Sequence, residues 1–477
     1  MSATSTPVRF VREFREICGA EHVIEDPARL EAARISGVTL TVAVAPASAD
    51  EVAAILRLAN EHGLSVVPAG GLTQHQTGNK PAQVDVLLVT TRLIEVEHYD
   101  PGDLTVGVGA GCTVAQLTSM VAKDGLLFAA DVAQPDRATV GGTLATGMTG
   151  PLRHGYGGLR DYCIGVRFVT ADGRKGKGGG RVVKNVAGYD MMKLLIGSWG
   201  TLAVITSASF KLFPAPRQTR TFIAEFDTAA EALAYRDIVL RSPLNPICLE
   251  LVRLPGKVMT WGIHVRASGS DAVLARYRSE LGRAVSREAE GEEESYWRTL
   301  ADFSALERAR DPDCLVLSLI VPLRDVRRVL DLTHEVAAAN GFALAVVGRV
   351  GAGHLLMSLA PDTALRIDPD AAPRTTIEVS SRPRASARAE GPAVCLESPA
   401  LTQPAADLQP GRTYVAALRN LTQNLPHDAS LSVLYCPELL RNEIATWQKT
   451  PTDLASMRAV KQALNPKDIL NRGRFIF

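Results

Sequence analysis

The sequence predicts a two-domain α+β protein, and three features of the chain support this. A chain of 477 residues is longer than one hydrophobic core usually organises, so two domains are expected. Strand-like and helix-like segments alternate over residues 39–125, beginning with a compact βαβ unit. Over residues 221–359 the alternation suggests an antiparallel sheet covered by helices. The apolar fraction of 46% is ordinary for a globular protein.

Charge and cysteine content argue against several classes of protein. The formal net charge of +1 gives no electrostatic reason to expect binding to nucleic acid or an acidic membrane surface. The seven cysteines are scattered without C-x-x-C or C-x-x-H spacing, so iron–sulfur and structural zinc sites are not expected. The N-terminus is charged, and the longest apolar run, 314–323, is too short to cross a bilayer. A cytoplasmic protein with reduced thiols is the expectation.

Composition and turn residues suggest the domain boundaries. Residues 1–38 are expected to form an N-terminal lead, residues 39–216 a first domain and residues 217–450 a second domain. Within the second, residues 367–412 are rich in Pro, Ala, Arg and Ser, which indicates a partly disordered insertion or linker. Residues 451–477 form a C-terminal segment that begins with a helix.

The first domain opens with a strand at 39–46 and a helix introduced by the capping box of Ser48 and Glu51. The next strand, 64–67, runs into P-A-G-G-L-T-Q-H-Q-T-G at 68–78. Adjacent glycines at the carboxyl end of a strand can aim amide groups at a phosphate, although a plain surface turn has the same composition.

The other expected elements follow in order along the chain. We expect strands at 84–89, 103–111 and 163–170, a helix over 113–125 and a hairpin over 201–213 in the first domain; and strands at 221–226, 247–252, 260–266, 314–321, 343–348 and 354–359, with helices starting near 228, 271 and 325, in the second.

Gly107-x-Gly109-x-Gly111 imitates a dinucleotide-binding fingerprint between a strand and a helix. The spacing is wrong, because Val114 stands where glycine or alanine should pack the helix on the strand. An NAD-type site is therefore not expected.

The densest glycine run covers residues 136–200, and its interleaved aliphatic residues argue against a linker. Because glycine lets the backbone approach a ligand closely, we interpret this run as a cradle for a large cofactor.

Several motifs resemble the FAD-binding domain of the vanillyl-alcohol oxidase / p-cresol methylhydroxylase (PCMH/VAO) superfamily. They are P-A-G-G-L-T-Q (68–74), T-V-G-G-T-L-A-T-G (139–147), L-R-D-Y-C-I-G (159–165) and V-K-N-V-A-G-Y-D-M-M-K-L-L-I-G-S-W-G-T-L-A-V-I-T (183–206). Within it, V-K-N-V-A-G-Y-D with Y-D-P-G-D-L-T-V (99–106) is most similar to the FAD-binding subunit of bacterial glycolate oxidase. The resemblance implies a two-domain PCMH/VAO-type fold, with a ferredoxin-like α+β cap and a C-terminal segment that returns to the FAD domain.

The resemblance also implies which residues bind FAD. The pyrophosphate would contact Pro68, Ala69, Gly70, Gly71, Leu72, Thr73 and Gln74; the rest of the cofactor would contact Pro135, Gly141, Gly142, Thr143, Thr146 and Gly150, with Arg160, Asp161 and Gly165 beside the flavin and Val204 and Ile205 at the adenine.

Some positions depart from the superfamily pattern. Leu72 stands where members with a covalent flavin on this loop carry His, so noncovalent FAD is expected, and His75 is expected to be an ordinary loop histidine. Ala69 replaces a common basic residue. His354 is a lone histidine without the H-x-x-D-G-N-x-H of metal-using relatives, so no metal is expected. Arg472 replaces the proline of the closing N-P-G-R, and the sequence does not explain this change.

The implied activity is oxidation of a small 2-hydroxy acid of the glycolate or lactate type, by hydride transfer to flavin N5. Electrons would pass to an iron–sulfur partner or a quinone-linked acceptor. The reaction needs a base for the hydroxyl proton and a cation for the carboxylate. Weak candidates for the base, each with a structural alternative such as an ion pair, a helix start or a surface position, are His154, Tyr156, Lys184, Asn185 and Tyr189.

Two other functions stay open at this point. The chain could be a non-catalytic FAD-binding or assembly subunit of a glycolate-oxidase-type complex, or a stand-alone flavin dehydrogenase of another small alcohol. In a complex, the partners would be a second flavoprotein subunit and an iron–sulfur subunit. The expected location is cytoplasmic, or peripheral at the inner membrane through such a partner.

Overall fold

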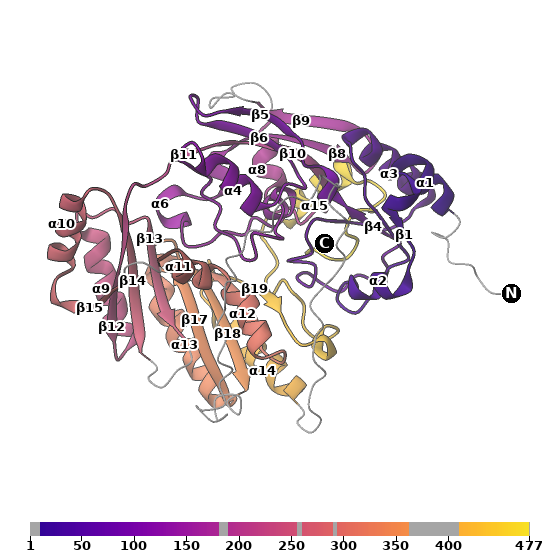
Figure 1. Cartoon of the computed structure of the whole chain (residues 1–477). Coiled ribbons are helices and arrows are strands. Elements are labelled where there is room, and N and C mark those ends of the chain that lie inside the picture. Colours follow the sequence, from indigo (N-terminus) through magenta and orange to yellow (C-terminus); the bar gives the residue numbers. More distant parts are fainter. Residues whose placement is uncertain (1–9, 181–188, 255–259, 290–292, 362–409, 477) are drawn as a thin grey trace.

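A computed structural model of the chain shows two domains, the first indigo to magenta and the second pink to orange in Figure 1. It describes residues 10–180, 189–254, 260–289, 293–361 and 410–476. Within these ranges, no helix combines the length and the apolar character that crossing a membrane requires.

A four-stranded sheet forms one half of the first domain. Its order is β1 (Val23–Ile24), β2 (Val42–Val44), β4 (Val86–Val89) and β3 (Val66–Ala69), with the last three parallel. The crossover helix α3 (Ala49–His62) begins at Ser48, whose Oγ accepts a hydrogen bond from the Glu51 amide at 3.1 Å, and ends at Gly63 in the left-handed region. The predicted βαβ unit is confirmed.

The described part of the N-terminal lead belongs to this domain. Helix α1 (Val11–Cys18) packs on α3, and Phe14 is fully buried in their shared core. Strand β1 pairs antiparallel with β2, and helix α2 (Pro27–Ala32) lies between these two strands in the sequence. The first domain therefore begins upstream of the expected boundary at residue 39.

A five-stranded antiparallel sheet forms the other half of the domain. Its order is β5 (Val96–Asp100), β6 (Thr105–Gly109), β10 (Ala203–Lys211), β8 (Cys163–Thr170) and β9 (Lys175–Gly179). The hairpin expected over 201–213 is wrong, because β10 is one strand that pairs with β6 on one side and β8 on the other. No turn residue interrupts the sequence of β10. Its pairing with β8 shifts register between Ile205 and Ser207, but the strand continues through this point.

Short helices connect and cover this sheet. They are α4 (Val114–Ala122), α5 (Val140–Thr146), α6 (Arg153–Tyr156), α7 (Leu159–Tyr162) and α8 (Met191–Leu195), and the two-residue strands β7 (Leu126–Leu127) and β11 (Phe213–Pro214) pair beside them. The glycine-rich segment after Thr139 is therefore a helical turn, α5, packed against β10.

The second domain, the cap, is built on one eight-stranded antiparallel sheet that contains two ferredoxin-like units. The first unit runs β12 (Thr219–Phe226), α9 (Ala229–Arg241), β13 (Cys248–Arg253), β14 (Trp261–Ser268), α10 (Asp271–Leu281) and β15 (Val285–Ala289); the second runs β16 (Leu315–Ile320), α13 (Val326–Ala339), β17 (Phe342–Arg349), β18 (His354–Pro361), α14 (Pro410–Asn424) and β19 (Ser430–Tyr435). Each unit is a βαββαβ repeat, and the sheet order is β15-β12-β14-β13-β17-β18-β16-β19. The second strands of the two units, β13 and β17, join the halves through pairs such as Leu251 with Gly348.

Helices cover both faces of the cap sheet. Helices α9, α10, α13 and α14 bury one face. Helices α11 (Glu293–Ala301) and α12 (Phe303–Arg310) pack on the other face, next to the first domain, through Trp297, Leu300 and Phe303. The expected insertion at 367–412 lies outside the described residues as far as 409, and residues 410–412 begin α14.

The C-terminal segment lies against the first domain. After α15 (Leu454–Leu464), the chain pairs with the edge of β3: the Val66 amide donates to Ile469 O at 2.8 Å, and the Asn471 amide donates to Val66 O at 2.9 Å. Ile469 and Leu470 are fully buried. Residues 471–474 are thereby held beside the loop that follows β3.

Candidate functional site: a glycine-lined cleft and a buried polar row

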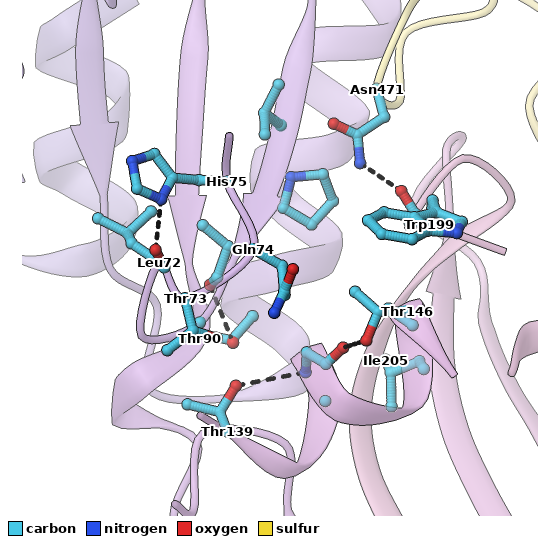
Figure 2. Close-up of a pocket in the computed structure, with 18 of the residues that line it drawn as sticks. Leu72, Thr73, Gln74, His75, Thr90, Thr139, Thr146, Trp199, Ile205 and Asn471 are labelled. Carbon is cyan, nitrogen blue, oxygen red and sulfur yellow. Dashed lines mark hydrogen bonds between the residues drawn. The ribbon is translucent and has the colours of Figure 1, made fainter. Parts of the chain in front are cut away.

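A cleft opens where the loop after β3 meets the first turn of α5, the start of β10 and the C-terminal segment (Figure 2). We call it the cofactor cleft; its empty space, part of it open to solvent, is about 920 Å³. It is lined by Ile35, Val67, Pro68, Ala69, Gly70, Gly71, Leu72, Thr73, Gln74, His75, Thr77, Thr90, Thr139, Gly141, Gly142, Ala145, Thr146, Trp199, Gly200, Ala203, Val204, Ile205, Asn471 and Arg474.

Most of the predicted cofactor residues meet in this cleft. They are Pro68, Ala69, Gly70, Gly71, Leu72, Thr73, Gln74, Gly141, Gly142, Thr146, Val204 and Ile205, and Thr143 lines an adjoining hollow that shares Thr73, Gln74, Gly142 and Thr146 with the cleft. Three separate segments of the chain, residues 68–74, 141–146 and 204–205, supply them.

The remaining predicted residues line neither the cleft nor its adjoining hollow. Pro135 O accepts a hydrogen bond from the Ala115 amide at 3.0 Å, and Arg160 donates to Ile196 O at 2.9 Å. Asp161 accepts from the Gly158 amide at 2.7 Å. A Cβ on Gly150 would lie 1.8 Å from Asp131 O, and Gly165 lies inside β8. Among the described contacts, these residues hold elements of the first domain together.

Glycine is required in the cleft because other atoms of the first domain occupy the positions that a Cβ would take. A Cβ on Gly71 would lie 1.8 Å from Arg137 O, and one on Gly70 would lie 2.0 Å from Thr139 Oγ1. The Cβ of a substituted Gly141 would approach Ala110 Cβ to 2.8 Å. The two glycine segments can therefore line the cleft only with bare backbone.

Leu72 occupies an unusual backbone position, with a φ of 58°, and the residue is 5% exposed. Non-glycine residues are uncommon in this left-handed region and concentrate at functional sites. Its carbonyl oxygen contacts His75 Nδ1, and His75 Nε2 is buried with no hydrogen-bond partner among the described residues. Burial lowers the pKa of His75 to about 4, so this imidazole is neutral at physiological pH.

Two residues from the C-terminal segment complete the lining. Asn471 Nδ2 donates to Trp199 O at 2.6 Å, whereas its buried Oδ1 has no partner in the part of the chain that the structure describes. Arg474 donates to His75 O at 2.7 Å and also contacts Thr77 O. Burial lowers the pKa of Arg474 to about 10, so the guanidinium keeps its charge at neutral pH. We did not predict either side chain, although the C-terminal motif that contains them resembled the superfamily.

This lining fits FAD. Bare glycine backbone and threonine hydroxyls suit a pyrophosphate, Arg474 supplies the positive charge that Ala69 does not, and the apolar wall at Val204 and Ile205 suits a flat ring. The unpartnered Asn471 oxygen can accept a hydrogen bond from an amino or hydroxyl group of the cofactor.

A row of ionisable residues crosses the cap sheet on its α11 and α12 side. Glu250 on β13 pairs with His264 on β14, and Arg349 on β17 pairs with His354 on β18. The β13–β17 register, extended by one residue, sets Glu250 opposite Arg349. We call Glu250, Arg349, His354 and Ser318, together with Asp131 of the first domain, the cap-sheet cluster. Arg349 also lines the hollow beside the cofactor cleft, with Thr73 and Gln74.

The two carboxyl groups of the cluster are hard to ionise. Glu250 is completely buried, and neither of its oxygens has a hydrogen-bond partner among the described residues. Burial raises the pKa of Glu250 to about 8, with Asp131 adding to the rise and Arg349 opposing it. Burial also raises the pKa of Asp131 to about 7, against the hydrogen bond from the Leu152 amide.

His354 links Arg349 to Ser318. Arg349 Nη1 lies 3.4 Å from His354 Nδ1, and His354 Nε2 lies 2.9 Å from Ser318 Oγ. A guanidinium can only donate, so Nδ1 accepts and the proton is on Nε2, which donates to Ser318. Burial, followed by the charge of Arg349, keeps the pKa of His354 well below its usual value. Within the described ranges, no three His, Cys, Asp or Glu residues group to hold a metal ion.

The three predicted catalytic candidates that the structure describes do not line the cleft or its adjoining hollow. His154 and Tyr156 lie on α6, away from the lining of the cleft and its adjoining hollow, and Tyr156 packs on Phe213 with ring centroids 5.0 Å apart. Tyr189 is 90% exposed. Lys184 and Asn185 lie outside the described residues. The sequence prediction missed Glu250 and Arg349; a lone Glu inside the apolar strand C-L-E-L-V was the available signal of a buried carboxyl.

Comparison with known families matches both domains. Residues 40–175 match the FAD binding domain family, and residues 263–387 with 439–475 match the C-terminal domain of FAD linked oxidases.

Several curated proteins are similar in sequence. The glycolate oxidase subunit GlcD of Bacillus subtilis is 27% identical over 334 residues, which are 65% of this chain and 71% of that protein. A D-lactate dehydrogenase of Archaeoglobus fulgidus is 37% identical over 44% of this chain and 47% of its own length. The glycolate oxidase subunit GlcE of Escherichia coli is 36% identical over 26% of this chain and 35% of its own. The last two matches thus span less than half of each relative.

Solved structures share the fold. p-Cresol methylhydroxylase with substrate bound superposes with a TM-score of 0.72 at 15% identity, covering 99% of this chain and 97% of that one. Alkyldihydroxyacetonephosphate synthase has a TM-score of 0.67 at 15% identity, covering 98% of this chain and 85% of the other. The PCMH/VAO-type fold and its α+β cap are thereby confirmed.

Proposed function

The chain belongs to the FAD-linked oxidases, and on this premise we propose that it oxidises a small 2-hydroxy acid of the glycolate or lactate type. The observation that carries the proposal is the position of Arg349. This buried cation of the cap lines a hollow that shares four residues with the cofactor cleft. Relatives named as a glycolate oxidase subunit and as D-lactate dehydrogenases support the substrate class.

FAD bound in the cleft would supply the acceptor of the hydride. The backbone of residues 70–74, the Thr139 turn and the charge of Arg474 would hold the pyrophosphate, and Val204 and Ile205 would lie against the adenine side. Leu72 offers no nucleophile for a covalent bond to the flavin, so we propose that FAD is bound noncovalently.

Arg349 holds the carboxylate of the substrate. Its planar guanidinium suits a carboxylate, and its buried Nε has no hydrogen-bond partner in the described part of the chain. The hydrogen bond to His354 restricts its orientation. A 2-hydroxy acid anchored there presents its hydroxyl carbon to the hollow beside the cleft.

Glu250 accepts the hydroxyl proton. It stands across the strand pair from Arg349, and both of its oxygens lack a described hydrogen-bond partner. A base with a pKa of about 8 gains proton affinity from its burial, at the cost of being only partly ionised at neutral pH. A substrate hydroxyl would supply the missing hydrogen bond.

The interface between the domains limits the access of water to this region. Helices α11 and α12 cover the cap-sheet cluster, and Asp302 accepts a hydrogen bond from the Gln134 amide of the first domain at 2.7 Å. A site with little water strengthens the contacts of Arg349 and Glu250 with a bound acid.

We propose further that the chain works as a subunit. Two of its relatives are named as subunits of glycolate oxidase. The six cysteines that the structure describes are buried and separate, so an iron–sulfur partner is the natural next carrier of electrons.

The test is the visible spectrum of the purified protein before and after acid precipitation, followed by anaerobic addition of glycolate or D-lactate. We expect flavin that acid releases and that one of these acids bleaches. Acid-stable flavin would contradict noncovalent binding. A flavoprotein that neither acid reduces would contradict the proposed substrate class, and a chain that cannot be loaded with FAD would favour the assembly function.

A further inference from the structure

A second pocket lies between the two domains, on the other side of the loop formed by residues 72–76. Leu72, Thr73 and His75 line both this pocket and the cofactor cleft, so the loop is the shared wall. In Figure 2 the side chains of Leu72 and His75 point away from Trp199 and Asn471. The far wall belongs to the cap, at α12 and the end of β19.

Four arginines converge on this second pocket, and we call it the arginine pocket. They are Arg34 and Arg137 of the first domain and Arg308 and Arg441 of the cap. The carboxylate among the lining residues is Glu438, which pairs with Arg34 at 2.8 Å. Arg137 donates to Gly71 O at 3.1 Å. The pocket therefore carries a clear excess of positive charge.

The two cap arginines flank one aromatic ring. The guanidinium carbons of Arg308 and Arg441 lie 5.5 Å and 5.9 Å from the centre of the Tyr435 ring. Arg441 is 7% exposed, and within the described ranges neither arginine pairs with a carboxylate. Burial, together with the charges of Arg441 and Arg137, lowers the pKa of Arg308. Like charges held together in a partly desolvated site destabilise the protein unless an anion joins them.

A polar group in the same wall also lacks a partner. Ser36 is 1% exposed, and its hydroxyl has no hydrogen-bond partner among the described residues although it lines the pocket. Its backbone has a φ of 48°, in the left-handed region that serine seldom adopts. A buried hydroxyl usually has a hydrogen-bond partner, so Ser36 indicates a place for a ligand oxygen.

We propose that the arginine pocket binds a small polyanion, a compound with several phosphate or carboxylate groups, at a site separate from the cofactor cleft. Guanidinium groups bind phosphates and carboxylates in the same bidentate way, and several of them favour a ligand with more than one negative charge. The empty space of about 1160 Å³, part of it open to solvent, admits more than a single phosphate ion. Because walls from both domains meet here, such a ligand would tie the cap to the loop that borders the cofactor cleft. This inference does not depend on the substrate that the flavin oxidises.

The experiment is calorimetric titration of the FAD-loaded protein with inorganic pyrophosphate and, separately, with citrate. The variants are Arg308→Gln and Arg441→Gln. The control is Arg324→Gln, which removes a cap arginine whose side chain is 71% exposed and pairs with Asp428. We expect binding of at least one probe, weakened about tenfold or more in each pocket variant and within about twofold of wild type in the control. Tighter pyrophosphate binding would identify a phosphate ligand, and tighter citrate binding a carboxylate ligand.

Two results would overturn the proposal: no binding of either probe to the wild type, or equal binding in all variants. The ratio of flavin to protein absorbance is measured in every sample. Loss of FAD from Arg308→Gln or Arg441→Gln, with folding intact by circular dichroism, would assign these arginines to the flavin site and also contradict a separate pocket. Neither readout requires that a hydroxy acid reduce the flavin, so failure here is distinct from failure of the proposed activity.

Discussion

The cofactor cleft and the cap-sheet cluster are neighbours built in opposite ways. The cleft is lined by short segments such as residues 68–75 and 139–146, in which bare glycine backbone lies beside threonine hydroxyls, and Arg474 is its charged side chain. The cluster is made of side chains on four different strands of one sheet, plus Asp131 from the other domain. Backbone sites depend on where glycine is placed, whereas the cluster depends on register and burial. The two should therefore fail differently when they are mutated.

The largest effect is expected from adding one carbon to the cleft backbone. In Gly71→Ala the new Cβ would lie 1.8 Å from Arg137 O, so the loop must move. We expect the purified variant to lose essentially all of its FAD, measured as the ratio of absorbance at the flavin band to that of the protein. The matched control is Gly102→Ala in an exposed turn, where the Cβ would come no closer than 3.3 Å to a flexible Asp100 side chain. Retention of flavin by Gly71→Ala would show that the loop does not bind the cofactor.

The next largest effect is expected from removing the unpartnered carboxyl group. Glu250→Gln should keep FAD but slow anaerobic reduction of the flavin by about 10²–10⁴-fold, the range for loss of a general base. Glu307→Gln, which removes another buried carboxylate, one paired with Arg310, should reduce its flavin at nearly the wild-type rate. An unchanged rate in Glu250→Gln would assign proton removal to another group.

Although Glu250→Gln should lose activity, it should be more stable than the wild type at higher pH. A carboxyl group whose pKa is raised by folding contributes to stability while it is protonated, and that contribution is lost as pH rises through the folded-state pKa. The wild type should therefore lose stability relative to Glu250→Gln between about pH 4.5, the ordinary value, and about pH 8. Urea unfolding at several pH values measures this difference, and parallel pH profiles would contradict a buried, protonated Glu250.

A smaller effect is expected from the carboxylate anchor. Arg349→Gln should raise the substrate concentration needed for half-maximal flavin reduction by about 10²-fold, because a lost charge-assisted contact costs about 3 kcal/mol. Arg253→Gln is the matched control: Arg253 is also buried, but strand alternation sets it on the opposite face of the cap sheet, where it donates to Leu344 O at 2.7 Å. An equal shift in both variants would indicate a general loss of cap structure.

The smallest effect is expected at the end of the C-terminal segment. Asn471→Ala removes an unpartnered oxygen that lines the cleft and a hydrogen bond to Trp199 O. We expect FAD to bind about tenfold more weakly in fluorescence titration, as for one or two lost hydrogen bonds. Asn340→Ala, which removes a 2.7 Å hydrogen bond to Val336 O at the end of α13, should leave FAD affinity unchanged. If Asn471→Ala binds FAD as tightly as the wild type, Asn471 has only a structural role.

The same contrast explains what the sequence could and could not predict. Gly70, Gly71, Gly141 and Gly142 are adjacent pairs in short motifs, so their place in one cleft could be predicted from local sequence. The single strand β10 could not, since choosing a strand over a hairpin depends on the neighbours β6 and β8. Arg349 and Glu250 are about a hundred residues apart in the chain and become neighbours only through the pairing of β13 with β17. No local spacing encodes that pairing, whereas each ferredoxin-like unit follows from its own βαββαβ pattern.

The most direct test of the central claim is a crystal structure of the FAD-loaded protein with oxalate, a carboxylate that the flavin cannot oxidise. The prediction is a flavin along the glycine backbone of the cofactor cleft and an oxalate carboxylate within hydrogen-bonding distance of the Arg349 guanidinium. A flavin in the cleft with oxalate bound elsewhere, for example in the arginine pocket, would contradict the role given to the cap-sheet cluster.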